Sequence, residues 1–193
     1  MLVVLVVAAV LLAVLAVTGI QISRSYRPSA VQAWPDLVDP GHTSSAEPTA
    51  RVVHRTAAGV LGLVGVAGLA TAIGWSVTAR RRTWAGGLGL LGLVVLGGYT
   101  GFLLPWDQLG LWAVTVGSHV GGIWDAGFSD SVRFILIDGG EVSQGQYRAA
   151  IAIHLGSGVA LAGVLALLAR SALRGARSRS SSAPDEARAT VPG

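Results

Sequence analysis

Four long apolar blocks constrain the fold of this chain more than any other feature. They cover Leu2–Ile22, Val52–Ala79, Trp84–Leu104 and Ala149–Leu168. A membrane helix needs about 20 consecutive apolar residues. Lipid offers no hydrogen-bond partners, so a spanning backbone must form its hydrogen bonds internally, as a helix does. We therefore expect an all-α integral membrane protein, a four-helix bundle formed by residues 1–172. The expected helices span residues 2–23, 52–79, 84–105 and 148–172.

Arginine carries all the positive side-chain charge, because the chain has no lysine. One arginine cluster, Arg80–Arg82, follows the second block, and a second one lies after the fourth block, at Arg170, Arg174, Arg177 and Arg179. Both clusters fall on the same side of the predicted bundle, which the positive-inside rule assigns to the cytoplasm. We expect a multi-pass protein of the cell membrane with both termini cytoplasmic. Because the arginines flank apolar blocks, we expect lipid and not nucleic acid as the partner.

The segments outside the blocks are polar or mixed. Prolines at 28, 35, 40 and 48 argue against regular structure in the first outer loop. Leu109–Val120 is apolar with a tryptophan and is typical of a short interfacial helix. Leu173–Gly193 is rich in serine, arginine and alanine and predicts a disordered cytoplasmic tail. The absence of cysteine excludes disulfides and covalent c-type haem attachment, and we expect the first block to be a retained membrane helix.

Two histidines lie near the outer ends of two predicted helices that run in the same direction. His54 follows Arg51 by three residues, and His154 follows Arg148 by six. At about 1.5 Å of rise per residue, the two side chains lie within roughly one turn of the same depth. A polar side chain inside a membrane is costly unless it has a partner. We expect both to bind one haem iron, with Arg51 and Arg148 near the propionates. The alternative is that the histidines are hydrogen-bonded within the bundle.

Glycines at the same depth provide thin walls for a flat ring. Gly19 lies near the outer end of the first helix, and Gly97, Gly98 and Gly101 lie near the outer end of the third. Glycine allows a backbone to approach a ligand closely. The alternative is that these glycines only bring membrane helices together.

The stretch GGYTGFLLPWDQLGLWAV at Gly97–Val114 resembles the end of the third helix and the following loop of cytochrome b and cytochrome b6. Thr18-Gly19 resembles the Thr-Gly of the family's first helix, and Arg51-x-x-His54 resembles the start of its second. The segment from Gly139-Gly140 to His154 resembles the loop that leads to the fourth helix. The resemblance implies the N-terminal, haem-binding half of the family, in which Gly87 and Gly101 contact haem.

The departures from the family are specific. Each family helix with a haem ligand carries a second histidine fourteen residues later, and here these positions are Gly68 and Leu168. Leu5 stands where the family has a glycine. Neither Gly68 nor Leu168 can bind iron, so we expect one haem b and no inner haem. Gly87 remains, and close packing is the explanation we expect. The family's quinol-oxidising glutamate motif is missing from this sequence.

These observations predict a membrane electron-transfer subunit of a respiratory chain. Its single haem would relay electrons between quinol and a redox partner on the periplasmic side, together with a C-terminal cytochrome b-like subunit. We expect a redox subunit of a quinol-linked oxidoreductase and not a complete enzyme. Two other functions stay open: a structural subunit derived from a cytochrome b half, and a haem-modifying enzyme, since His54-Arg55 also resembles haem A synthase, a family without the Pro-Trp-Asp-Gln signature.

Several polar residues of the outer loops have two interpretations. Asp107 and Gln108 are candidates for the edge of a quinone site, or they cap a helix end and face water. His119 could bond to a quinone or a partner, but a solvated loop position is favoured, as it is for His42. The loop acids, which we expect to be solvated and not to bind a metal, are Asp125, Asp130, Asp138 and Glu141.

Overall fold

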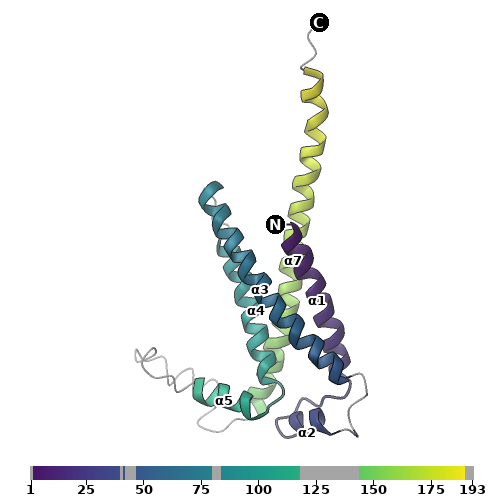
Figure 1. Cartoon of the computed structure of the whole chain (residues 1–193), viewed down its shortest axis with the longest axis vertical. Coiled ribbons are helices and arrows are strands. Elements are labelled where there is room, and N and C mark those ends of the chain that lie inside the picture. The colour runs from purple at the N-terminus through teal and green to yellow at the C-terminus, as the bar shows by residue number, and fades with distance from the viewer. Residues whose placement is uncertain (1, 40, 42–46, 80–83, 118–143, 190–193) are drawn as a thin grey trace, which may run out of the picture.

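A computed structural model describes residues 2–39, 41, 47–79, 84–117 and 144–189 of the 193-residue chain. Within these ranges every regular element is a helix. The long helices are α1 (Leu2–Ser23), α3 (Glu47–Ala79), α4 (Trp84–Leu103) and α7 (Gln144–Ala189). Two short ones, α2 (Ala33–Val38) and α5 (Gln108–Gly117), lie at the end of the bundle away from the N-terminus (Figure 1).

The four long helices of the described ranges are each long and apolar enough to cross a membrane. The candidate spans are Val3–Ser23, Glu47–Val77, Trp84–Leu103 and Tyr147–Ser171. Many large apolar side chains on them point outward, for example Leu63 at 72% and Val159 at 75% exposure. In water such a surface would aggregate, whereas in a bilayer it faces lipid. The prediction of an all-helical integral membrane bundle is therefore confirmed.

The helices pack as a closed ring of neighbours. α1 packs against α3 and α7, and α4 packs against the same two helices from the other side. Their apolar contacts form a cluster around Ala8, Leu61, Leu161 and Leu165. The start of α1 and the later part of α7 lie at the same end of the bundle (Figure 1), as expected for an even number of crossings.

The helix ends differ from the predicted ones for local reasons. α3 begins at Glu47, five residues before the predicted start. Pro48 is tolerated in a first turn, where no backbone N–H is needed, and the Glu47 carboxylate suits the positive end of the helix dipole. α4 ends at Leu103, two residues before the predicted end, because a residue that precedes a proline, here Leu104, disfavours the helical conformation.

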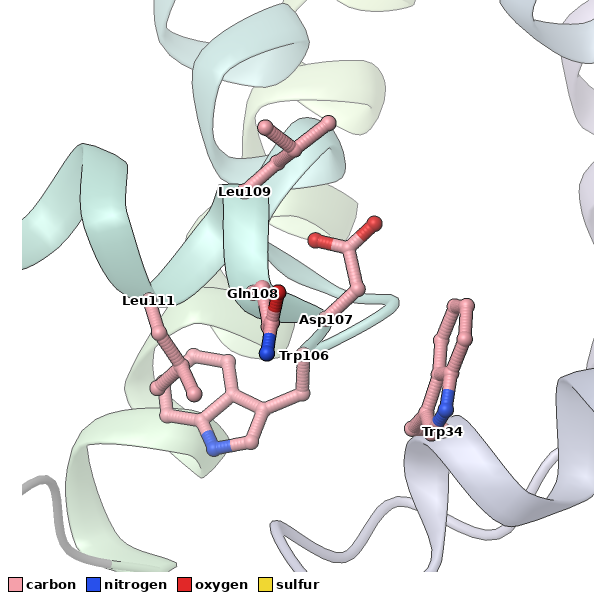
Figure 2. A pocket seen from close by; sticks show the side chains of 6 residues that line it. All are labelled: Trp34, Trp106, Asp107, Gln108, Leu109 and Leu111. Carbon is pink, nitrogen blue, oxygen red and sulfur yellow. The ribbon is translucent and has the colours of Figure 1, made fainter.

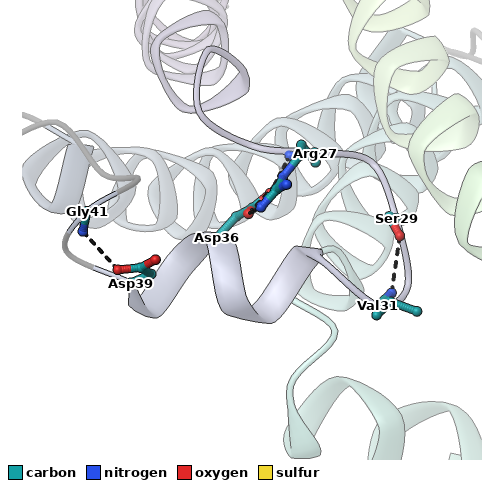
Figure 3. Close-up of polar contacts among 6 residues, drawn as sticks. All are labelled: Arg27, Ser29, Val31, Asp36, Asp39 and Gly41. Atoms are coloured by element: carbon teal, nitrogen blue, oxygen red, sulfur yellow. Dashed lines mark hydrogen bonds and ion pairs between the residues drawn. The ribbon is translucent and has the colours of Figure 1, made fainter.

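The loop after α1 contains regular structure that the prolines did not suggest. α2 accommodates Pro35 within its first turn. Asp36 of α2 is 1% exposed and forms an ion pair with Arg27, whose backbone N–H also donates to it at 2.8 Å (Figure 3). The hydrogen bond from the guanidinium to this carboxylate raises the pKa of Arg27. The expectation of an irregular loop is thus wrong for residues 33–38.

The last helix is longer than the sequence predicts. We expected a disordered tail from Leu173, but α7 continues to Ala189 and extends beyond the other helices (Figure 1). A helix already nucleated by its membrane span grows without a new nucleation cost, and here it continues past Gly175 and Pro184, two residues of low helix propensity. The predicted inner turn at Arg80–Arg82 lies outside the described residues.

Candidate functional site

Two histidine side chains meet between α3 and α7, in the half of the bundle that lies toward α2 and α5. The ring centroids of His54 and His154 are 6.2 Å apart, and the ring planes are tilted by 53°. Both residues are partly buried. An imidazole nitrogen binds a metal at about 2 Å, so two rings that hold one metal from opposite sides have centres roughly 6 Å apart. The observed spacing of 6.2 Å fits one metal ion bound by both rings.

The His54 ring is held by α1 through a threonine. The hydroxyl of Thr18 donates to the carbonyl of Val14 at 2.7 Å, and its oxygen lies 2.9 Å from Nδ1 of His54. A hydroxyl has one proton to donate. We assign the hydroxyl proton to the Val14 carbonyl, its shortest contact, and in this assignment Nδ1 of His54 carries a proton and donates to Thr18. Nε2 is then the nitrogen with the free lone pair.

The His154 ring is held by α4 through a backbone group. Its Nδ1 lies 2.8 Å from the carbonyl oxygen of Gly97. A carbonyl only accepts, so Nδ1 of His154 also carries the proton. Both imidazoles are therefore fixed in the tautomer that leaves Nε2 unprotonated, and this is the arrangement in which a metal-binding histidine is oriented by its second nitrogen.

Two of the predicted glycines lie against these rings. A Cβ at Gly19 would lie 3.4 Å from Cε1 of His54, and one at Gly101 would lie 2.7 Å from Cε1 of His154. Gly101 leaves room for the His154 ring because glycine alone has no Cβ. Gly98, which we also expected at the cofactor, is exposed and has nothing within 4 Å of its Cβ position. Its neighbour Gly97 faces inward instead, because the helical rotation of about 100° separates the two.

The two predicted propionate arginines lie outward of the histidines. Arg51 lies one turn before His54 on α3, and its guanidinium donates to the carbonyl of Leu37 in α2 at 2.7 Å. Arg148 lies in the early part of α7 and is exposed. Contact with a propionate therefore stays a prediction for both side chains.

A recess opens beside the turn that follows α4. It is lined by Trp34, Trp106, Asp107, Gln108, Leu109 and Leu111. Figure 2 shows that Trp34, from α2, stands across from Asp107 on the other side of this recess. The turn itself depends on Trp106, which has a positive φ of 52° although it is not glycine.

Asp107 has a structural role in this recess. Its Oδ1 accepts the backbone N–H of Gly110 at 2.7 Å, which is the contact of a helix N-cap at the start of α5. Of the two interpretations of Asp107, the structure therefore supplies evidence for capping. A quinone edge at Asp107 and Gln108 stays a prediction. The sequence analysis did not predict Trp34 at this recess. A large aromatic residue in an otherwise polar loop was the one feature that could have indicated it.

Two tyrosines that the sequence did not single out fasten the outer end of α4. The hydroxyls of Tyr26 and Tyr147 both donate to the carbonyl of Leu104, Tyr147 at 3.1 Å. Tyr147 is fully buried and packs edge-on against Trp106, with ring centroids 4.9 Å apart. These contacts join the loop after α1, the end of α4 and the start of α7, and so fix the outer ends of the helices that carry the site.

The inner half of the bundle is lined by aliphatic side chains. Leu5, Leu12 and Val64 pack around the core cluster of Ala8, Leu61, Leu161 and Leu165. Gly68 faces Val4, whose Cγ1 lies 3.6 Å from the Cβ position. The chain offers no histidine at either inner position, Gly68 or Leu168.

Gly87 has a packing role in this inner half. A Cβ there would lie 3.1 Å from Cβ of Ala72 and 3.3 Å from Cα of Leu69. The backbones of α3 and α4 thus approach each other closely at this point, which explains a glycine without a second haem. The candidate loop residues His42, His119, Asp125, Asp130, Asp138 and Glu141 lie outside the described residues, as does Gly139-Gly140.

The chain is similar to known membrane cytochromes. The family model described as cytochrome b/b6/petB matches residues 2–128. Cytochrome b6 of Amphidinium operculatum is 34% identical over 104 residues, which are 52% of this chain and 47% of that protein. Cytochrome b6 of Porphyra purpurea is 30% identical over 141 residues, 71% of this chain and 64% of that protein. The chain thus spans about half the length of the relatives it matches.

The matched region holds most of the site. It includes His54 with its partner Thr18, the glycines that face both rings, and the turn at Trp106, whereas His154 follows it. A family model that covers residues 2–128 of 193 accounts for more than half of the chain. The chain therefore belongs to the cytochrome b/b6 family, whose members are haem-binding membrane cytochromes that transfer electrons.

Proposed function

We propose that this chain is an electron-transfer subunit that holds a single b-type haem near the outer face, with His54 and His154 as the axial ligands. The observation that carries the proposal is the state of the two imidazoles. Each has its Nδ1 engaged by a neighbouring helix, and each keeps Nε2 free at a ring spacing of 6.2 Å. When bound, haem supplies reversible one-electron chemistry. The protein orients the ligands and excludes water.

A single haem is supported by the inner half of the bundle. The family's second ligand positions hold Gly68 and Leu168, and the core cluster in this half is made of aliphatic side chains. Two features there oppose a second ring: the absence of an imidazole and the close approach of α3 to α4 at Gly87. Electrons would therefore enter and leave on the outer side.

The surroundings of the site support its orientation and partners. Arg51 and Arg148 lie on the outer side of the histidines, where haem propionates would meet water, and a guanidinium suits a carboxylate in charge and geometry. The recess of Trp34, Asp107 and Gln108, about 570 Å³ in volume, is within the usual size of a ligand site. We propose quinol as the ligand there. A second cytochrome b-like subunit and a redox protein on the periplasmic side complete the proposal.

The arginine clusters support placing both termini in the cytoplasm, in the cell membrane. The similarity to cytochrome b6 proteins supports an electron-transfer role in a respiratory or similar chain. The competing assignment is a structural subunit that kept the helix packing and binds no haem.

The deciding experiment is a reduced-minus-oxidised visible spectrum of the purified full chain, together with the haem-to-polypeptide ratio. We expect a low-spin b-type α band and one haem per chain. His54→Ala and His154→Ala should each abolish the band. Leu61→Ala, which removes a buried side chain two turns further along the same face of α3, should retain it. Absence of the band in the wild-type chain would favour the structural subunit, and two haems per chain would refute the single-haem assignment.

A further inference from the structure

The two imidazoles of the site are held by chemically different groups. Nδ1 of His154 meets a backbone carbonyl, that of Gly97. Nδ1 of His54 meets a side-chain hydroxyl, that of Thr18, which itself donates a hydrogen bond to the Val14 carbonyl. Thr18 is 8% exposed, so water does not replace this contact freely. A removable side chain therefore helps to hold one ring, together with the Leu15 backbone, whereas a backbone carbonyl holds the other.

α4 carries a counterpart of Thr18 that contacts no imidazole directly. Thr100 precedes Gly101 as Thr18 precedes Gly19, and it is 5% exposed. Its hydroxyl bonds within its own helix, to the carbonyls of Leu96 at 2.7 Å and Gly97 at 3.2 Å. The two threonines share residue type, burial and helix context. Thr18 contacts an imidazole directly, whereas Thr100 contacts the Gly97 carbonyl, the same group that accepts the hydrogen bond from His154.

We propose that Thr18 is a positioning residue that fixes the tautomer and raises the basicity of His54, and thereby lowers the reduction potential of the haem. The haem part of this inference rests on the proposed function. A hydrogen bond accepted from Nδ1–H gives the imidazole more negative charge at Nε2. A more basic ligand stabilises ferric iron more than ferrous iron. Loss of the hydroxyl therefore raises the potential.

The test compares three variants of the full chain by potentiometric titration and low-spin EPR. Thr18→Val removes the hydroxyl and keeps the shape. If it weakens the ferric state about tenfold relative to the ferrous state, the potential rises by about 59 mV, the one-electron equivalent of a tenfold change. Thr18→Ser restores the hydroxyl and should return the potential and the EPR signal to those of the wild type. Thr100→Val removes no direct hydrogen bond of an imidazole and leaves the contact of His154 with Gly97 in place, so it should shift the potential less than Thr18→Val does.

The outcomes separate clearly. Equal potentials for Thr18→Val and Thr100→Val would overturn the proposal, and so would a failure of Thr18→Ser to restore the wild-type value. If Thr18→Val loses haem while Thr18→Ser and Thr100→Val retain it, the positioning role is supported in a stronger form.

A second measurement needs neither a variant nor haem. Nitrogen-15 NMR of the histidine rings in the haem-free full chain reports which nitrogen carries the proton. We expect His54 to be protonated at Nδ1, and protonation at Nε2 would refute the role of Thr18 whatever the outcome of the haem experiments. Conversely, a chain that shows the Nδ1 tautomer and binds no haem would refute the proposed function alone.

Discussion

Gly101→Ala tests the geometry of the candidate site with the smallest possible change. The added methyl group would lie 2.7 Å from Cε1 and 3.0 Å from Nδ1 of His154. The His154 ring cannot simply rotate away, because its Nδ1 is hydrogen-bonded to the carbonyl of Gly97, which lies on α4 as Gly101 does. Either that hydrogen bond breaks or α4 and α7 separate.

The size of the effect follows from this contact. Carbon atoms pack at about 3.5 Å or more, so a methyl group at 2.7 Å forces a retreat of about 0.8 Å. That exceeds the roughly 0.5 Å within which a ligand must be held. We expect haem affinity to fall about 10- to 100-fold, as for the loss of an orienting contact. Overpacking costs about 1–3 kcal/mol, offset by about 1 kcal/mol of helix propensity gained on replacing glycine.

Two matched substitutions isolate the steric term. Gly98→Ala gains the same helix propensity next to the site, but nothing lies within 4 Å of its Cβ position, so haem binding should be unchanged. Gly19→Ala meets the His54 ring at 3.4 Å, which is an ordinary contact, and should lose less affinity than Gly101→Ala. The assay is haem titration of the purified chain, followed by the α band and by thermal unfolding in detergent. Wild-type affinity in Gly101→Ala would refute this account of the site.

Two further substitutions test the packing around the site. Gly87→Ala should lower the free energy of unfolding by about 1–3 kcal/mol, because its methyl group would press on α3. Gly86→Ala meets nothing within 4 Å and should leave it unchanged. Equal melting temperatures of the two variants in detergent would show that α3 and α4 are not in close contact at Gly87. Tyr147→Phe should cost about 1 kcal/mol for one lost hydrogen bond, and no more, because Tyr26 still donates to the Leu104 carbonyl; a loss of several kcal/mol by thermal unfolding would mean that Tyr147 alone holds this end.

The long helices could be predicted because a bilayer leaves few alternatives. α1 begins and ends where the hydropathy of the sequence places it, at Leu2 and Ser23. The departures occur where water replaces lipid. There, α2 forms despite Pro35, and α7 continues to Ala189, because outside lipid the apolar length of the sequence no longer sets where a helix begins or ends.

The sequence was sufficient to predict the depth of the candidate site in the membrane. Counting residues from the helix starts was enough to pair His54 with His154, and the structure brings them together. The same counting could not choose between Gly97 and Gly98, which differ by one helical step. It also gave no means to recognise that Thr18 holds a ring 36 positions away.

The sequence by itself determined which segments are long and apolar enough to cross a membrane and which residues share a depth. These properties follow from apolar length and from a fixed rise per residue, which need no knowledge of the neighbours. Only the tertiary structure decided which side of each helix faces the centre, which nitrogen of each imidazole is engaged, and where two backbones touch. Those depend on the rotation of every helix against its neighbours, because the helices settle together by packing and interhelical hydrogen bonds in lipid.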